Sequence, residues 1–138
     1  MNSKRLLDWL YPRRCAFCDE VLGNMEKYLC HSCQRRMPKP IGEPNCKKCG
    51  KPLVDERKEF CTDCGKKHHV YTQGKAVFVY EGGIRNSMYR FKYGNKREYA
   101  EFYANAALEK YGVWLNKIKA EVLIPIPMYS RKTVSYTH

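Results

Sequence analysis

The sequence contains Cys15-Ala16-Phe17-Cys18 and, eleven residues later, Cys30-His31-Ser32-Cys33. The same arrangement returns 31 residues further on, as Cys46-Lys47-Lys48-Cys49 and Cys61-Thr62-Asp63-Cys64. All eight cysteines of the chain belong to these four pairs. Two copies of one spacing, with no cysteine left over, indicate an internal duplication that depends on its sulfur atoms.

Cysteine pairs of this spacing are typical of zinc knuckles, in which two tight turns supply four thiolates to one tetrahedral ion. Gly50 and Gly65 follow the second cysteine of their pairs, where a left-handed backbone is useful, and Asp19 takes that place in the first pair. After the second pair this place holds Gln34, which favours a helical turn that ends before Pro38. We expect two structural zinc ions bound in sequential order, with an interleaved exchange of pairs as the alternative. The expected ligands are Cys15, Cys18, Cys30 and Cys33 for one ion, and Cys46, Cys49, Cys61 and Cys64 for the other.

Three other uses of these cysteines compete with structural zinc. Disulfides need an oxidising compartment, a rubredoxin-like iron site is a rarer use of the pattern, and catalytic zinc keeps an open position that four thiolates close. His31, His68 and His69 lie near the pairs, but each ion already has four sulfurs. We expect these histidines to be surface residues or neighbours of the ligands.

Composition limits the class of protein. With 138 residues and 43% hydrophobic residues, the chain has room for one domain or two very small ones and is too apolar to be disordered throughout. No stretch approaches the roughly 18 apolar residues of a membrane span. The start of the chain carries Asp8 in a short apolar run without a cleavage site, so we expect no signal peptide and a cytoplasmic location. The net charge of +12 is compatible with attraction to nucleic acid or with ordinary solvated lysines.

Outside the cysteine pairs, apolar periodicity and turn residues predict a few elements. In chain order these are a helix over 5–11, a proline-containing linker over 34–45, a strand over 76–80, helices over 84–93 and 96–118, and a buried strand over 122–124.

This order predicts a small zinc-stapled double zinc ribbon with an N-terminal helix over residues 1–70. An incomplete α/β, parallel-sheet half-domain is expected over residues 71–138. Two strands and two helices are too few to cover both faces of a parallel sheet. We therefore expect Val122 to Ile124 and Ile126 to keep an unpaired edge or an uncovered face, which allows self-association. Either a partner completes this core or the chain is truncated.

Several further segments occur in a characteristic order and spacing. They are Leu6 to Asp8, Pro12 to Cys15, Leu29 to Cys33, Cys46 to Gly50, Tyr80 to Gly82, Arg85, Arg90 to Gly94, and Ile124 to Met128. Together they resemble the ComF competence family, whose longer members join a double zinc ribbon to a type I phosphoribosyltransferase-like domain. The resemblance implies a phosphoribosyltransferase-like second segment and an accessory role in DNA uptake during transformation. It also implies single-stranded DNA or a competence helicase as partner.

The phosphoribosyl-pyrophosphate loop of the longer members is missing from this sequence. Such a loop places two adjacent acids before a Thr/Gly-rich turn that opens a helix and holds phosphate. The adjacent acid pairs here are Asp19-Glu20 and Asp55-Glu56, both between the cysteines and neither followed by Thr-Gly. After Pro127 the sequence also departs from the family pattern. We therefore expect no catalytic residues and no enzyme activity in this chain.

The segment Tyr89-Arg90-Phe91-Lys92-Tyr93 alternates aromatic and cationic side chains. Bases stack on aromatic faces while cations follow the phosphates of a single strand. The alternative is that Phe91 and Tyr93 are core residues of a helix. The basic residues that we expect to contact nucleic acid are Lys47, Lys48, Lys66, Lys67, Arg90, Lys92, Lys96 and Arg97. The competing functions are a zinc-ribbon module that binds proteins and a fragment of a phosphoribosyltransferase.

Overall fold

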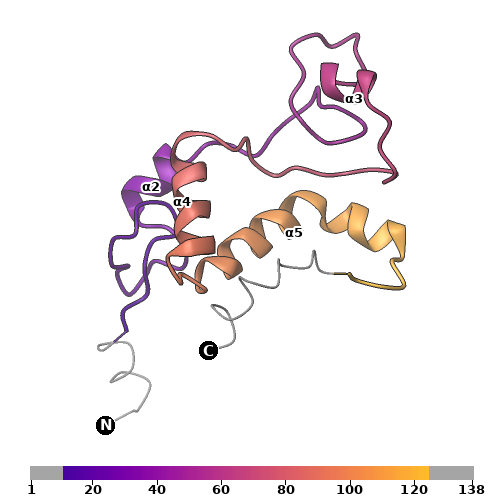
Figure 1. Cartoon of the computed structure of the whole chain (residues 1–138). Coiled ribbons are helices and arrows are strands. Elements are labelled where there is room, and N and C mark those ends of the chain that lie inside the picture. Colours follow the sequence, from indigo (N-terminus) through magenta and orange to yellow (C-terminus); the bar gives the residue numbers. More distant parts are fainter. Residues whose placement is uncertain (1–10, 125–138) are drawn as a thin grey trace.

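The computed structural model describes residues 11–124, so nearly all of the helix expected over 5–11 lies outside the described residues, as does Ile126. The helices are α2 (His31–Arg36), α3 (Thr62–Lys66), α4 (Gly82–Tyr93) and α5 (Tyr99–Ile118). In Figure 1, α2, α4 and the start of α5 gather around the first cysteine copy, whereas α3 lies apart with the second. No helix within residues 11–124 has the length and apolar character that crossing a membrane requires.

The two cysteine copies fold as small irregular loops, which we call ribbon one (residues 13–37) and ribbon two (residues 44–68). Each contains one isolated antiparallel bridge, Arg14 with Val21 in ribbon one and Asn45 with Pro52 in ribbon two. These two bridges lie 31 residues apart, which is the period of the sequence repeat. The duplication found in the sequence is therefore also present in the structure.

The two longer helices confirm the sequence prediction with small differences at their ends. α4 begins two residues earlier than expected and ends at Tyr93, as expected. The N–H of the following Gly94 donates to the Arg90 carbonyl oxygen at 2.7 Å. α5 begins three residues later than expected and ends at Ile118, as expected; the following Lys119 takes a left-handed conformation with φ 45°. Such a residue commonly closes a helix because it turns the chain away from the helix axis.

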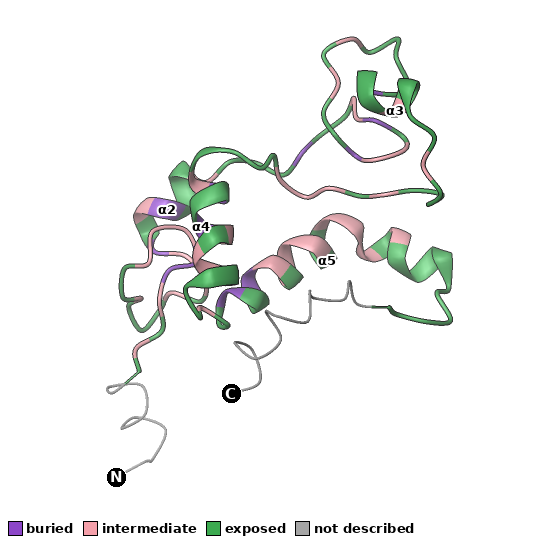
Figure 2. Ribbon diagram, in the orientation of Figure 1, coloured by how far each residue is buried: buried purple, intermediate pink, exposed green. Residues whose placement is uncertain are grey.

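The core joins ribbon one to α4 and α5. Ala16, Tyr99 and Phe102 are at most 7% exposed and lie at its centre, where Figure 2 shows buried residues in the loops of ribbon one and in α5. The half-buried residues around them are Tyr28, Leu29, Met37, Phe78, Phe91 and Tyr103. The Phe17 ring lies so close to Gly83 that a side chain at Gly83 would begin 2.1 Å from it. Glycine at this position is what lets α4 approach ribbon one.

The strand predicted over residues 76–80 is wrong. This segment is an irregular connection from ribbon two to α4 with several bends, and it has no neighbouring strand among the described residues. Its polar groups bond elsewhere: the Val77 carbonyl oxygen accepts from the Ile41 N–H at 2.8 Å, and the Ala76 carbonyl oxygen accepts from the Tyr111 hydroxyl at 2.7 Å. The Lys110 ammonium donates to the carbonyl oxygens of both Ile41 and Ala76. Side chains of α5 thus satisfy backbone groups that a sheet would have paired.

The buried strand predicted over Val122–Ile124 is also wrong. These three residues follow α5 as an irregular segment and are 70%, 90% and 84% exposed. The described part of the chain contains isolated bridges and no sheet, so the parallel-sheet half-domain is not supported. The expectation that these side chains lack a covering face is confirmed for the three described residues. Because strands need a partner for their backbone groups, β propensity alone does not form one.

Candidate metal centres and basic surfaces

In ribbon one, a tight turn and the start of a short helix direct four sulfur atoms toward one point. Cys15 and Cys18 lie on a turn closed by the Asp19 N–H, which donates to the Cys15 carbonyl oxygen at 2.9 Å. Asp19 has φ 70°, the left-handed conformation that short polar residues tolerate. Cys30 precedes α2, Cys33 lies within it, and the Cys30 N–H donates to Cys15 Sγ at 3.3 Å.

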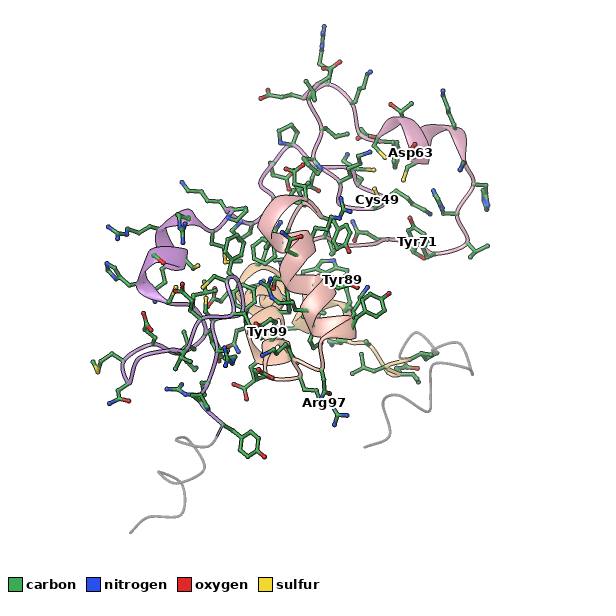
Figure 3. The ribbon with its side chains drawn as sticks, turned by 60° about the vertical axis from the view of Figure 1, so that its left-hand side comes forward. Cys49, Asp63, Tyr71, Tyr89, Arg97 and Tyr99 are labelled. Atoms are coloured by element: carbon green, nitrogen blue, oxygen red, sulfur yellow. The ribbon has the colours of Figure 1, made fainter. Side chains whose placement is uncertain are left out.

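Ribbon two repeats this arrangement at the same relative positions. Gly50, which replaces Asp19, has φ 76°. Two backbone bonds of 2.8 Å correspond: the Cys15 N–H donates to the Glu20 carbonyl oxygen, and the Cys46 N–H donates to that of Lys51. Two bonds to sulfur, each of 3.3 Å, also correspond: the Cys30 N–H donates to Cys15 Sγ, and the Cys61 N–H donates to Cys46 Sγ. Figure 3 shows Cys49 and Asp63 of this second centre. The local backbone therefore does not depend on the side chains that differ between the copies.

The sulfur positions fit tetrahedral zinc. Within each set of four, the sulfur atoms lie within 4.8 Å of one another. A Zn–S distance of about 2.3 Å gives a sulfur–sulfur edge of about 3.8 Å. The Sγ distances are 3.7 Å for Cys18–Cys30 and 3.8 Å for Cys49–Cys61, and all eight cysteines are free thiols. The sets follow sequential order, so the structure does not adopt the interleaved alternative.

The thiol acidities also favour a cation, because four close thiols cannot all ionise alone. The Ser32 hydroxyl, 3.3 Å from Cys30 Sγ, lowers the pKa of Cys30 to about 6, whereas burial raises the pKa of Cys18. Burial opposes ionisation of Cys46, yet nearby backbone N–H groups lower its pKa to about 6. Burial raises the pKa of Cys64 to about 12. A divalent ion stabilises all four thiolates together, and a closed four-sulfur shell suits a structural ion.

The histidines near the pairs do not join the sulfur sets. His31 and His68 are exposed, and the half-buried His69 ring lies 5.1 Å from the Tyr71 ring. Burial and the nearby Cys64 thiol raise the pKa of Tyr71, so this side chain lies near the second centre, a neighbour that spacing did not predict. Figure 3 shows Tyr71 beside Cys49. Position 71 has no repeat signal, since the first copy holds Pro40 there.

The candidate nucleic-acid residues of ribbon two lie on the surface. Lys47 pairs with Glu59, and the Lys48 ammonium lies 5.2 Å from the centre of the Tyr71 ring. Lys66 and Lys67 are exposed at the end of α3. Two of the four lysines are thus already engaged with neighbours in the same ribbon or next to it.

The candidates around α4 divide into internal and exposed groups. The Arg90 guanidinium donates to the Phe17 carbonyl oxygen at 2.5 Å, and the Lys96 ammonium lies 3.1 Å from the Asp19 carboxylate. These two cations attach the helices to ribbon one. Lys92 and Arg97 are exposed, and Figure 3 shows Arg97 at the surface.

The aromatic residues of α4 divide in the same way. Phe91 packs against the core with its ring centre 5.9 Å from that of Tyr103, so the core alternative is right for Phe91. It is wrong for Tyr93, which is 59% exposed. Tyr89 is 62% exposed, and the two tyrosine ring centres lie 5.0 Å apart.

Comparison with known proteins identifies the N-terminal region. Residues 6–65 match the family model described as Double zinc ribbon domain. No curated protein sequence matches the chain, and no solved structure does. With the two four-cysteine sets, this match makes the region a double zinc ribbon with two structural zinc sites.

Proposed function

We propose that this double zinc ribbon protein binds single-stranded nucleic acid through an aromatic surface on α4. The observation that carries the proposal is the pair Tyr89 and Tyr93, whose rings lie 5.0 Å apart and are both more than half exposed. Such rings offer planar faces to unpaired bases, and each stacked base contributes about 1–3 kcal/mol. Figure 3 shows Tyr89 on the surface of α4.

The helical period supports one continuous binding face. Arg85, Tyr89 and Tyr93 are spaced by four residues, and Lys92 lies three residues after Tyr89, so all four lie on one side of α4. All four are exposed. The core of α4 is formed from a different face, in which Ile84 and Ser87 are buried. A strand on this face meets rings and cations together, which is the combination that single strands require.

In this proposal the zinc ions support the surface and take no part in chemistry. The resemblance to the ComF competence family extends the proposal to an accessory role in DNA uptake, with single-stranded DNA as ligand and a competence helicase as a second partner. The missing phosphoribosyl-pyrophosphate loop is our reason for proposing that this chain transfers no phosphoribosyl group.

The test is fluorescence anisotropy with a labelled oligothymidylate and with a duplex, each at two salt concentrations. We expect preference for the single strand, weaker binding at higher salt, and a loss of about fivefold or more in the double variant Tyr89→Ala/Tyr93→Ala. Leu108→Ala is the control, because Leu108 is 57% exposed on α5, outside the proposed face. Undetectable binding, or equal binding by the double variant and wild type, contradicts the proposal.

A further inference from the structure

A groove lies between the segment that precedes the first cysteine pair and the turn joining α4 to α5. Its lining includes Arg13, Arg14 and Lys96 as cations, Tyr11 and Asn95 as neutral donors, and Glu98 as an acid. Three cations from two separate parts of the chain converge there. The groove also includes Gly94, the residue directly after Tyr93, so it lies at the C-terminal end of α4.

Neighbouring groups hold two of these cations in place. The Arg14 Nη1 donates to the Asp19 carbonyl oxygen at 2.9 Å. The Asp19 carboxylate attracts both Lys96 and Arg14, so one negative charge is shared by two cations and part of the guanidinium charge remains uncompensated. The Lys96 ammonium pairs with the Asp19 carboxylate at 3.1 Å and is largely balanced by it. Arg14 therefore presents a fixed positive charge, and rigid placement lowers the entropic cost of ordering it around a ligand.

The remaining charges leave the groove positive. Arg13 is exposed, and its side chain makes no hydrogen bond or ion pair with any residue in 11–124. The one acid in the lining, Glu98, adjoins the N-terminus of the 20-residue helix α5, where the helix dipole offsets negative charge. An arginine pair with nearby neutral donors suits a tetrahedral oxyanion, because guanidinium groups bind such ions through two parallel hydrogen bonds.

We propose that this groove binds a phosphate group, and that the phosphate belongs to the strand whose bases stack on Tyr89 and Tyr93. This inference rests on the proposed function for the identity of the strand, although the groove itself does not depend on base stacking. A free phosphate ion has the same chemistry and is the other source that the experiment must distinguish.

The test follows the backbone amides of the full chain by NMR during titration with inorganic phosphate and, separately, with an oligothymidylate, at constant ionic strength. Both probes should shift Asn95 and Lys96 saturably. Arg13→Ala should weaken both effects on the order of tenfold, since a charged hydrogen bond is lost. Lys58→Ala, which removes one positive charge from an exposed position of ribbon two outside the candidate nucleic-acid residues, should leave the groove amides unchanged.

The outcomes separate this inference from the proposed function. If the oligothymidylate shifts Tyr89 and Tyr93 but not the groove, the phosphate assignment is overturned and base stacking stands. If inorganic phosphate shifts the groove and the strand does not, the assignment to a strand is overturned. Equal weakening by Arg13→Ala and Lys58→Ala would show only general charge attraction and would also overturn the groove assignment.

Discussion

The four cysteine sulfur atoms have the same arrangement in ribbon one and ribbon two, but the side chains around them differ. At equivalent positions, ribbon one has Ala16, Phe17, Tyr28 and Leu29 where ribbon two has Lys47, Lys48, Glu59 and Phe60. The first set packs against α4 and α5, and Ala16 is 2% exposed. Three of the second set are charged, and Lys47 pairs with Glu59 in solvent. The same four-cysteine loop is thus part of the hydrophobic core in ribbon one and extends away from that core in ribbon two.

The two ribbons differ in what stabilises them: ribbon one packs against the helices, whereas ribbon two depends mainly on its metal ion. Ribbon two meets the rest of the protein chiefly through the chain that follows it: the Gly74 N–H donates to the Lys48 carbonyl oxygen at 2.6 Å, and the Gln73 amide donates to that of Lys47 at 3.0 Å. A side chain at Gly50 would begin 2.7 Å from the Ala76 nitrogen. These are backbone contacts with little apolar burial, so the metal must supply most of the stability of ribbon two.

The largest expected effect is loss of a ligand. Cys49→Ser should release one zinc ion and unfold ribbon two, because structural zinc contributes on the order of 10 kcal/mol in small zinc-finger peptides. Residues 82–118 should keep their protection. Cys18→Ser should instead loosen α4 and α5 as well, since they pack on ribbon one. Zinc stoichiometry and hydrogen exchange check both variants. Equal loss of protection over 82–118 in the two variants would show that both ribbons support α4 and α5 to the same extent.

Exchanging the equivalent residues 16 and 47 should have the next largest effect. Ala16→Lys places a charge beside the buried rings of Tyr99 and Phe102 and should cost about 2–5 kcal/mol of unfolding free energy. Lys47→Ala should change it by less than about 0.5 kcal/mol, because Lys47 is exposed. Urea unfolding of the zinc-loaded protein measures both. Similar costs at the two positions would contradict the assignment of the core to ribbon one.

A third pair of variants tests the contact between ribbon one and α4. Gly83→Ala should destabilise the protein by about 1–3 kcal/mol, because the added carbon would begin 2.1 Å from the Phe17 ring. Gly112→Ala has open space around it on α5 and should stabilise the helix by about 0.5–1 kcal/mol. Thermal unfolding should therefore shift in opposite directions, and a stabilising Gly83→Ala would disprove the close packing.

The smallest expected difference in unfolding free energy is between the loss of one polar contact in ribbon one and the loss of one in ribbon two. The Tyr99 hydroxyl donates to the Asp19 carboxylate at 2.5 Å. Burial raises the pKa of Asp19, but this bond and the Lys96 ammonium hold it below its ordinary value. Tyr99→Phe should cost about 1–2 kcal/mol. Lys51→Ala, which breaks the exposed 3.4 Å pair with Asp63, should cost less than about 0.5 kcal/mol in the same unfolding assay. The reverse order would mean that ribbon two relies on its side-chain pairs.

The sequence predicted the features that depend on local spacing. Cysteine separations define both sulfur sets, and apolar periodicity with Gly94 defines α4 and α5. It did not predict contacts made across the chain, such as the roles of Arg90 and Lys96 as internal attachments of ribbon one. It misread residues 76–80 because β propensity was present and a partner strand was not. The exposed tyrosine pair was in the predicted segment, but only the fold separates it from Phe91.

The hydrogen bond from the Ile41 N–H to the Val77 carbonyl oxygen has a topological consequence. The chain leaves the helical body after Ile41 and re-enters it at Val77, and these two points lie side by side, 2.8 Å apart between donor and acceptor. Ribbon two is therefore an inserted cassette with adjoining ends. Insertions of this geometry can be shortened, exchanged or lost without moving the host's core. Selection can thus remodel the projecting ribbon while the docked ribbon stays tied to its helices.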